Sequence, residues 1–260
     1  VFIHPTKGSV MPEMLFYEKP VPLSNITHAD WKLDRSELRY EFADKINSVV
    51  LAGIEFVEAS KDYPIVFAKA GEEDVPVALL GLRATGNLYL DAKGHWLPDH
   101  YVPAFVRRYP FVLADGPGSE PVVCIDEAYS GFSQTRGEPL FENGETQPIL
   151  TKAMEFLGEF QRQFDRTKRF VSVLKANDLM TEVSATVKDE NATETHLKGL
   201  MVVDEKKLLG LSDEVVLSLF RSGELSWIYA HLMSISNLKR LTLELGGNDA
   251  GIILPDVDVE

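Results

Sequence analysis

The sequence predicts an α+β fold, with an antiparallel sheet mainly from the N-terminal half, helices mainly from the C-terminal half, and one late hairpin. Short β-branched and aromatic runs, separated by turn clusters, fill residues 64–125. From residue 148 on, apolar residues instead repeat every three or four positions, as on one face of a helix. Strands and helices segregated along the chain in this way favour an α+β fold over a parallel doubly wound sheet.

The N-terminal segment is rich in proline and polar residues and has no dominant period. Pro20 and Pro22 exclude a helix there, because proline lacks a backbone donor and restricts the preceding residue. We therefore expect residues 1–30 to form an extended arm that lies over the core. Residues 47–52 are either a strand or another short buried segment, and the pattern does not decide between them.

Five apolar runs predict strands in the N-terminal half. Residues 64–68, 75–82 and 87–91 are spaced as an antiparallel meander, with turn clusters between them. Residues 111–114 and 122–125 predict two further strands, on either side of a loop that is rich in glycine and proline.

A long amphipathic helix is predicted from Pro148, since proline is tolerated in the first turn of a helix. Its apolar stripe consists of Ile149, Ala153, Phe156, Leu157, Phe160 and Phe164. The charged residues 165–169 predict a break after this helix. Residues 181–188 alternate between apolar and polar, as in a half-buried strand. Residues 196–203 are predicted to form the returning strand, so the two segments predict a hairpin.

Two more helices are predicted near the C-terminus. Residues 212–214 open the first, because small polar and acidic residues favour a helix N-terminus. After an interruption at residues 222–224, a second stripe runs from Leu225 to Leu238, and the glycine pair at residues 246–247 ends it. This helix is apolar on nearly all of its surface. It is therefore either buried in the centre of the protein or a contact in a homodimer. Residues 246–260 read as an acidic tail.

Composition narrows the class of protein. The 260 residues carry a formal net charge of −14, which argues against nucleic acid, whose phosphates need clustered Lys and Arg. No apolar stretch is long enough to span a membrane, and the first residues do not resemble a signal peptide. We expect a cytoplasmic protein by default, with export left open. No repeat or linker divides the chain, so residues 1–260 are predicted to form a single domain.

The densest mixture of chemical groups lies between Gly94 and Phe111. The candidate ligand-binding residues in this segment are His95, Trp96, His100, Tyr101, Arg107, Arg108 and Tyr109. Two adjacent guanidinium groups beside aromatic rings could hold a carboxylate or phosphate in bidentate fashion. The structural alternative is that one arginine pairs with a carboxylate at the edge of the core and the other is solvated.

A metal site is a rival interpretation of the same segment. His95, Asp99 and His100 provide two imidazoles and a carboxylate, a ligand set that suits non-haem iron. The two histidines are five residues apart with Pro98 between them, so one helix face does not bring them together. We expect these histidines to make hydrogen bonds within a loop instead, and no cofactor is predicted.

The single cysteine, Cys124, lies in an apolar strand and is expected to be a buried small hydrophobe rather than a nucleophile. With one cysteine, no disulfide within the chain is possible.

Several pieces together resemble the bacterial SapC family. The most specific are Tyr101-Val102-Pro103-Ala104-Phe105 and Arg107-Arg108-Tyr109-Pro110-Phe111. Further matching pieces lie at residues 81–82, 87–89, 94–96, 123–126, 137–141, 199–200, 203–208 and 228–232. The resemblance extends from about Tyr17 to Leu241.

The resemblance implies little about chemistry. The family takes its name from a protein linked to a bacterial surface layer, and its members resemble proteins found near outer-membrane receptors and flavin-dependent halogenases. It carries no established catalytic residues. From the residues we expect a non-catalytic binding or assembly protein that recognises a peptide, a carboxylate ligand or a protein partner. The alternatives are a non-haem metal-dependent or accessory enzyme acting on peptides or aromatic small molecules, and a surface-layer component.

Overall fold

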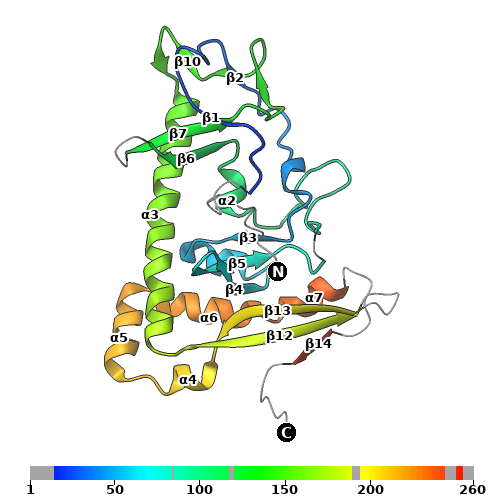
Figure 1. Cartoon of the computed structure of the whole chain (residues 1–260), viewed down its shortest axis with the longest axis vertical. Coiled ribbons are helices and arrows are strands. Elements are labelled where there is room, and N and C mark those ends of the chain that lie inside the picture. Colours follow the sequence, from blue (N-terminus) through cyan, green and yellow to red (C-terminus); the bar gives the residue numbers. More distant parts are fainter. Residues whose placement is uncertain (1–14, 84, 117–119, 189–193, 244–249, 254–260) are drawn as a thin grey trace.

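The computed structural model describes residues 15–83, 85–116, 120–188, 194–243 and 250–253. The described part is an elongated α+β molecule, which confirms the predicted fold class (Figure 1). Its largest sheet and most of its short helices lie at one end, and three small sheets lie toward the other. The long helix α3 (Pro148–Ala176) runs alongside both ends.

The largest sheet joins early and late parts of the chain. In spatial order its six antiparallel strands are β14 (Ala250–Ile253), β12 (Met180–Lys188), β13 (Glu194–Val203), β4 (Ile65–Ala70), β5 (Glu73–Leu79) and β3 (Ser48–Val50). The predicted late hairpin is present as β12 and β13. Met201 in β13 lies opposite Phe67 in β4, so this hairpin extends the sheet that the early strands begin.

Three smaller sheets make up the other end. The first consists of β1 (Pro20–Pro22), β7 (Pro121–Asp126) and β6 (Phe111–Asp115). The second consists of β8 (Phe132–Ser133), β2 (Lys32–Leu33) and β9 (Glu138–Pro139), and the third of β10 (Phe141–Glu142) and β11 (Glu145–Thr146). Within the segment predicted to form an N-terminal arm, β1 pairs along β7, and residues 1–14 lie outside the described residues.

Short helices surround the largest sheet and the connection between the two ends. They are η2 (Glu41–Ala43), η3 (Gly53–Glu55), α1 (Phe56–Ala59), α2 (Ala104–Arg107), α4 (Glu205–Leu209), α5 (Asp213–Ser222), α6 (Glu224–Ser234) and α7 (Asn237–Leu243). Among the helices of the described residues, none combines the length and apolar character that crossing a bilayer requires.

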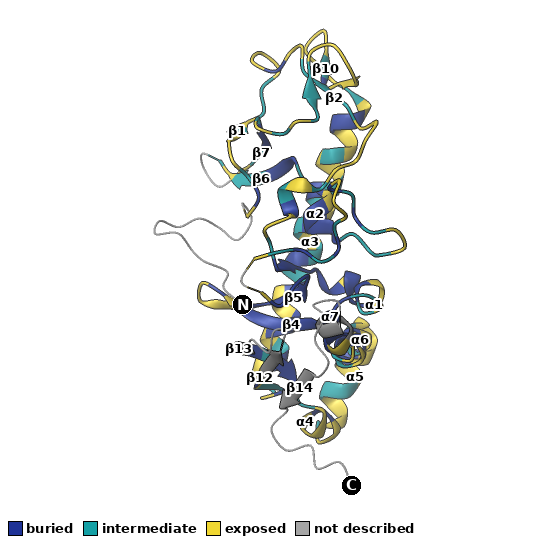
Figure 2. Cartoon of the chain, turned by 90° about the vertical axis from the view of Figure 1, so that its right-hand side faces the viewer, coloured by how far each residue is buried: buried dark blue, intermediate teal, exposed yellow. Residues whose placement is uncertain are grey.

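Helix α3 supplies side chains to two hydrophobic cores. Phe160, Phe170 and Leu174 belong to the larger core, which packs on the six-stranded sheet. Leu150 and Leu157 belong to a smaller core beside β6 and β7. Buried residues recur along α3 from Ile149 to Leu174. Strands β4 and β5, on which the larger core packs, are mostly buried (Figure 2). That the chain is a single domain stays a prediction.

The charged residues 165–169 do not break this helix, contrary to the prediction. Thr167 is fully buried at the position where the stripe calls for an apolar residue. Its hydroxyl donates to the carbonyl of Gln163 and accepts the backbone N–H of Gly53, both at 2.7 Å. Thr167 therefore continues the buried face, and the charged neighbours Lys168 and Arg169 are exposed beside it.

Residues 87–91 do not form the third strand of a meander, which is a second correction. The side-chain oxygen of Asn87 accepts the N–H of Tyr89 at 2.9 Å, so a local turn replaces the ladder. Leu90 makes an isolated bridge to Trp96. The place beside β5 is taken by β3, so the open question over residues 47–52 is resolved as a strand.

The predicted helix from Leu225 to Leu238 is divided into α6 and α7. Ser234 accepts the N–H of Ile65 at 2.9 Å, and Asn237 donates to the carbonyl of Ser60 at 2.7 Å. These contacts bind the junction to the sheet. The predicted glycine stop at residues 246–247 lies outside the described residues, and part of the expected acidic tail is strand β14.

The apolar stripe on α6 has one buried and one exposed side. Trp227 and Ile228 belong to the core, whereas Tyr229 and Met233 are exposed. The homodimer contact through this region stays a prediction.

Candidate functional site

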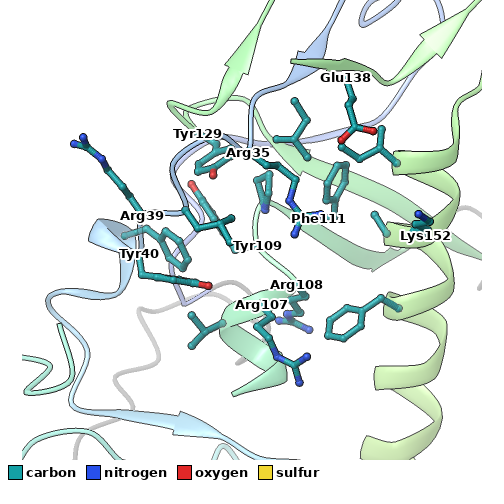
Figure 3. Close-up of a pocket in the computed structure, with 18 of the residues that line it drawn as sticks. Arg35, Arg39, Tyr40, Arg107, Arg108, Tyr109, Phe111, Tyr129, Glu138 and Lys152 are labelled. Carbon is teal, nitrogen blue, oxygen red and sulfur yellow. The ribbon is translucent and has the colours of Figure 1, made fainter. Parts of the chain in front are cut away.

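A cavity of about 430 Å³ lies where α2, α3 and the segment before η2 meet (Figure 3). Helix α2 brings Arg107, Arg108 and Tyr109 of the predicted segment to its wall. Lys152 and Phe156 come from the first turns of α3.

Positive charge dominates this cavity. The cationic residues that line it are Arg35, Arg39, Arg107, Arg108 and Lys152. Glu138 is the one acidic residue among the described residues of the lining. A chain with a net charge of −14 thus gathers five cations around one hollow. Such a concentration attracts anions, because low-dielectric walls focus the field of the charges that line them.

The five cations are not equally available. Arg39 is held by Glu37 at 2.5 Å and faces Glu41 at 3.5 Å, and these carboxylates raise the pKa of Arg39. Among the described residues, no acidic side chain forms an ion pair with Arg35 or Lys152. In Figure 3, Arg35 reaches toward Phe111, whereas Arg39 points away from the other side chains.

Arg107 is exposed but held in place. Its Nε donates to the carbonyl of Val102 at 2.9 Å, and its Nη2 donates to the hydroxyl of Tyr101 at 3.0 Å. The guanidinium carbon lies 5.5 Å from the centre of the Tyr101 ring and 5.3 Å from that of Phe156. Two ring faces and two neutral oxygens therefore position this cation without neutralising it.

Arg108 is buried at the end of α2. Its guanidinium carbon lies 4.0 Å from the centre of the Phe105 ring and 5.1 Å from that of Phe160. Arg107 and Arg108 thus both contact aromatic rings, Arg107 at the surface and Arg108 in the interior.

Aromatic rings form much of the remaining wall. They are Tyr40, Phe42, Tyr109, Phe111, Tyr129 and Phe156. Tyr109 stacks on Phe42 with ring centres 4.0 Å apart, and its hydroxyl donates to Asp126 at 3.0 Å. Burial, and then the charge of Asp126, raise the pKa of Tyr109, so its hydroxyl stays protonated and the ring acts as a neutral wall.

Four of the predicted binding residues do not line the cavity. Trp96 is buried, and its Nε1 donates to the hydroxyl of Tyr63 at 3.1 Å. His95 lies 3.2 Å from Asp91, and Nδ1 of His100 lies 2.9 Å from the carbonyl of Pro98. The fourth, Tyr101, stands behind Arg107 and supports it.

Among the residues that the structure describes, His95, Asp99 and His100 do not form a metal-binding group. Across the described residues, no group of three or more His, Cys, Asp or Glu side chains is placed to hold a metal ion. Asp99 has a φ of +62°, and His95 and His100 each bond within their own loop. The lining that the structure describes also lacks histidine and cysteine, so no acid–base pair or nucleophile of those types faces the hollow.

Sequence reasoning missed Arg35, Tyr40 and Lys152. The first two lie in a polar segment between the arm and β3, and Lys152 lies on the polar side of the helical stripe. A cation beside a tyrosine, as in Arg39-Tyr40, repeats the chemistry of Arg108-Tyr109 and could have found Tyr40, whereas no such local signal marks Arg35 or Lys152.

In the comparison with protein families, the SapC model matches residues 23–241 of this chain. No curated protein and no solved structure matches the chain.

Proposed function

The chain belongs to the SapC family, and from its cationic cavity we propose that it is a non-catalytic binding protein for a small organic carboxylate with an apolar, preferably aromatic, body. The observation that carries the proposal is the gathering of five cations and six aromatic rings around one cavity of about 430 Å³. That size lies within the range of sites for small organic ligands.

The two kinds of wall suit the two parts of such a ligand. A guanidinium group presents parallel N–H donors that match the two oxygens of a carboxylate. Aromatic rings bury an apolar body and accept contacts from its edge or face. Arg35 and Arg107 are the cations best suited to the anionic group, because acidic side chains of the described residues do not pair with them.

Binding of a matched pair of probes tests the proposal. We expect 2-naphthoate to bind saturably in isothermal titration calorimetry, and the uncharged 2-naphthamide to bind at least tenfold more weakly. Arg107→Gln and Arg35→Gln should each weaken 2-naphthoate by about tenfold or more, since hydrogen bonds to charged groups contribute about 1.5–3 kcal/mol. Equal affinity for the two probes would overturn the proposal.

Arg162→Gln is the matched control. Arg162 is an exposed arginine of α3 that pairs with Glu159 at 2.6 Å and does not line the cavity. Its substitution makes the same change in net charge, so an equal loss of binding would show that overall charge, rather than the cavity, attracts the probe. Inorganic phosphate as a competitor distinguishes a carboxylate site from a phosphate site: strong competition would favour the latter.

A further inference from the structure

We infer, on the basis of the proposed function, that Glu55 and Tyr101 are positioning residues that hold Arg107 with one edge open for the carboxylate of the ligand. Neither residue lines the cavity, yet a continuous chain of hydrogen bonds leads from Glu55 through Tyr101 to Arg107.

Glu55 is the buried end of this chain. Its side chain accepts the backbone N–H of Ala52 at 2.9 Å and that of Ala104 at 2.6 Å. The hydroxyl of Tyr101 donates to the same oxygen as Ala104, at 2.9 Å. Three donors thus converge on one carboxylate that is 5% exposed. Burial raises the pKa of Glu55, and these hydrogen bonds oppose that rise.

Tyr101 is immobilised at both its backbone and its hydroxyl. Its N–H donates to Asp62 at 2.8 Å, and its carbonyl accepts the hydroxyl of Tyr63. Since the Tyr101 hydroxyl donates its hydrogen bond to Glu55, its oxygen lone pairs are left to accept from Nη2 of Arg107. The buried carboxylate therefore sets the direction of the hydrogen bond that Arg107 makes.

The guanidinium group has five N–H donors in a rigid plane. Nε and one N–H of Nη2 are used by Val102 and Tyr101. Nε and Nη2 share one edge of the plane, so two of the three remaining N–H groups lie along the end formed by Nη1 and Nη2. That end matches the two oxygens of a carboxylate. Because the side chain is already ordered, less conformational entropy is lost when a ligand binds.

The tyrosine between the two charges explains how Arg107 can be fixed and still be available. Arg39 shows the opposite arrangement, since Glu37 contacts its guanidinium directly and takes up donors that a ligand would need. With Tyr101 as an intermediary, Glu55 orients Arg107 without occupying its outer edge.

Tyr101→Phe is the primary test, because it removes one hydroxyl and keeps the ring, whereas changes at Glu55 also disturb two backbone hydrogen bonds. We expect it to weaken 2-naphthoate about 3- to 10-fold, as the loss of one hydrogen bond does. Its affinity for 2-naphthamide should not change. In an Arg107→Gln background, Tyr101→Phe should have no further effect on 2-naphthoate, because the two residues act together.

Tyr89→Phe is the matched control. Tyr89 is a buried tyrosine whose hydroxyl donates to the carbonyl of Asp62 at 2.9 Å, and it is not among the residues that line the cavity. This variant should bind 2-naphthoate as the natural protein does. If Tyr101→Phe instead leaves 2-naphthoate unaffected, weakens both probes equally, or adds fully to Arg107→Gln, the positioning role is wrong while the binding function stands.

A measurement without ligand separates the two proposals. In ¹⁵N relaxation of the free protein, the Nε–H of Arg107 should be as ordered as the backbone, and Tyr101→Phe should make it more mobile, because only the hydrogen bond to Val102 then remains. Failure of the natural protein to bind 2-naphthoate would overturn the function only. An Nε–H signal that is equally mobile, or equally ordered, with and without the Tyr101 hydroxyl would overturn the positioning role whatever the probe does.

Discussion

The buried carboxylate of Asp126 accepts a hydrogen bond of 3.0 Å from the hydroxyl of Tyr109, and thereby connects the wall of the cavity to the N-terminal segment. The same carboxylate accepts the backbone N–H groups of Glu18 and Lys19, both at 2.9 Å, and that of Ala128 at 3.1 Å. Four donors from three parts of the chain thus meet on one side chain at the end of β7.

Asp126→Asn should lower the free energy of unfolding by about 3 kcal/mol, because the new amide group turns an N–H donor toward backbone N–H groups and leaves buried donors unsatisfied. Tyr109→Phe removes one of the four bonds and should cost about 1 kcal/mol. Urea denaturation followed by circular dichroism measures both. Asp99→Asn, on an exposed residue with positive φ, is the control and should change stability little. Equal stability of Asp126→Asn and the control would contradict this role.

Gly53 lies against the indole ring of Trp227, and a Cβ atom on Gly53 would fall 2.3 Å from Cε3 of that ring. Trp227 cannot retreat easily, since Phe170 packs against it with ring centres 5.3 Å apart. We expect Gly53→Ala to destabilise the protein by about 2 kcal/mol in thermal or urea unfolding, as overpacking of a core does.

Gly158→Ala is the matched control for that prediction. On Gly158, within α3, a Cβ would come no closer than 3.5 Å to a neighbouring atom, the end of the Arg162 side chain. Alanine has the higher helix propensity, so this variant should be more stable by about 0.5–1 kcal/mol. We expect the free energy of unfolding to fall for Gly53→Ala and to rise for Gly158→Ala. If it falls for neither variant, the packing argument is wrong.

His231 is expected to make the stability depend on pH. It is fully buried, its Nε2 accepts the N–H of Val203 at 3.0 Å, and its Nδ1 lies 2.8 Å from the carbonyl of Ile65. Burial lowers its pKa from 6.5 to about 4. Between these values the unfolded chain binds a proton that the folded protein excludes. The contribution of His231 to the free energy of unfolding therefore falls as the pH falls from about 7 to 4, and it changes no further below pH 4.

The size of this effect follows from the pKa difference. Between pH 7 and pH 5 the histidine should reduce the free energy of unfolding by about 2 kcal/mol. His231→Gln keeps an acceptor for Val203 and does not titrate, so its stability should lose about 2 kcal/mol less over the same range. Parallel pH profiles for the two proteins would show that His231 does not titrate as the fold implies.

Cys124 should be nearly inert in the folded protein. It is 6% exposed on β7, and burial raises the pKa of its thiol, so little of the reactive thiolate forms. This confirms the prediction of a buried small hydrophobe. Ellman's reagent at pH 8 should modify the native protein at least about tenfold more slowly than the protein in urea. Cys124→Ser supplies the blank, and fast labelling of the native chain would contradict the burial.

Local patterns predicted much of the fold. The strands around residues 65–68, 75–79, 111–114 and 122–125, the late hairpin, and the start of α3 at Pro148 all follow from periods and turn residues within short segments. Two of the errors fell where a polar side chain bonds a partner far away in the sequence. Thr167 continues a buried face because it bonds Gly53, and Ser234 ends α6 while bonded to Ile65.

The site could be predicted only in part for the same reason. The segment that holds Arg107, Arg108 and Tyr109 drew attention through its composition. Trp96 is an aromatic residue of the same segment, but its indole N–H donates to the hydroxyl of Tyr63 and its ring belongs to the core. No local rule distinguishes a ring that lines a cavity from one that fills an interior.

The sequence by itself determined the α+β class, the family, the burial of Cys124 and the segment that carries the arginine pair, because periodicity, turn residues and composition act over a few positions. Only the tertiary structure decided that Arg35, Arg107 and Lys152 surround one cavity and that Glu55 stands behind Tyr101. Those relations join residues far apart in the chain, and they arise when sheet, helix and loop pack together and bring buried acceptors within reach of their donors.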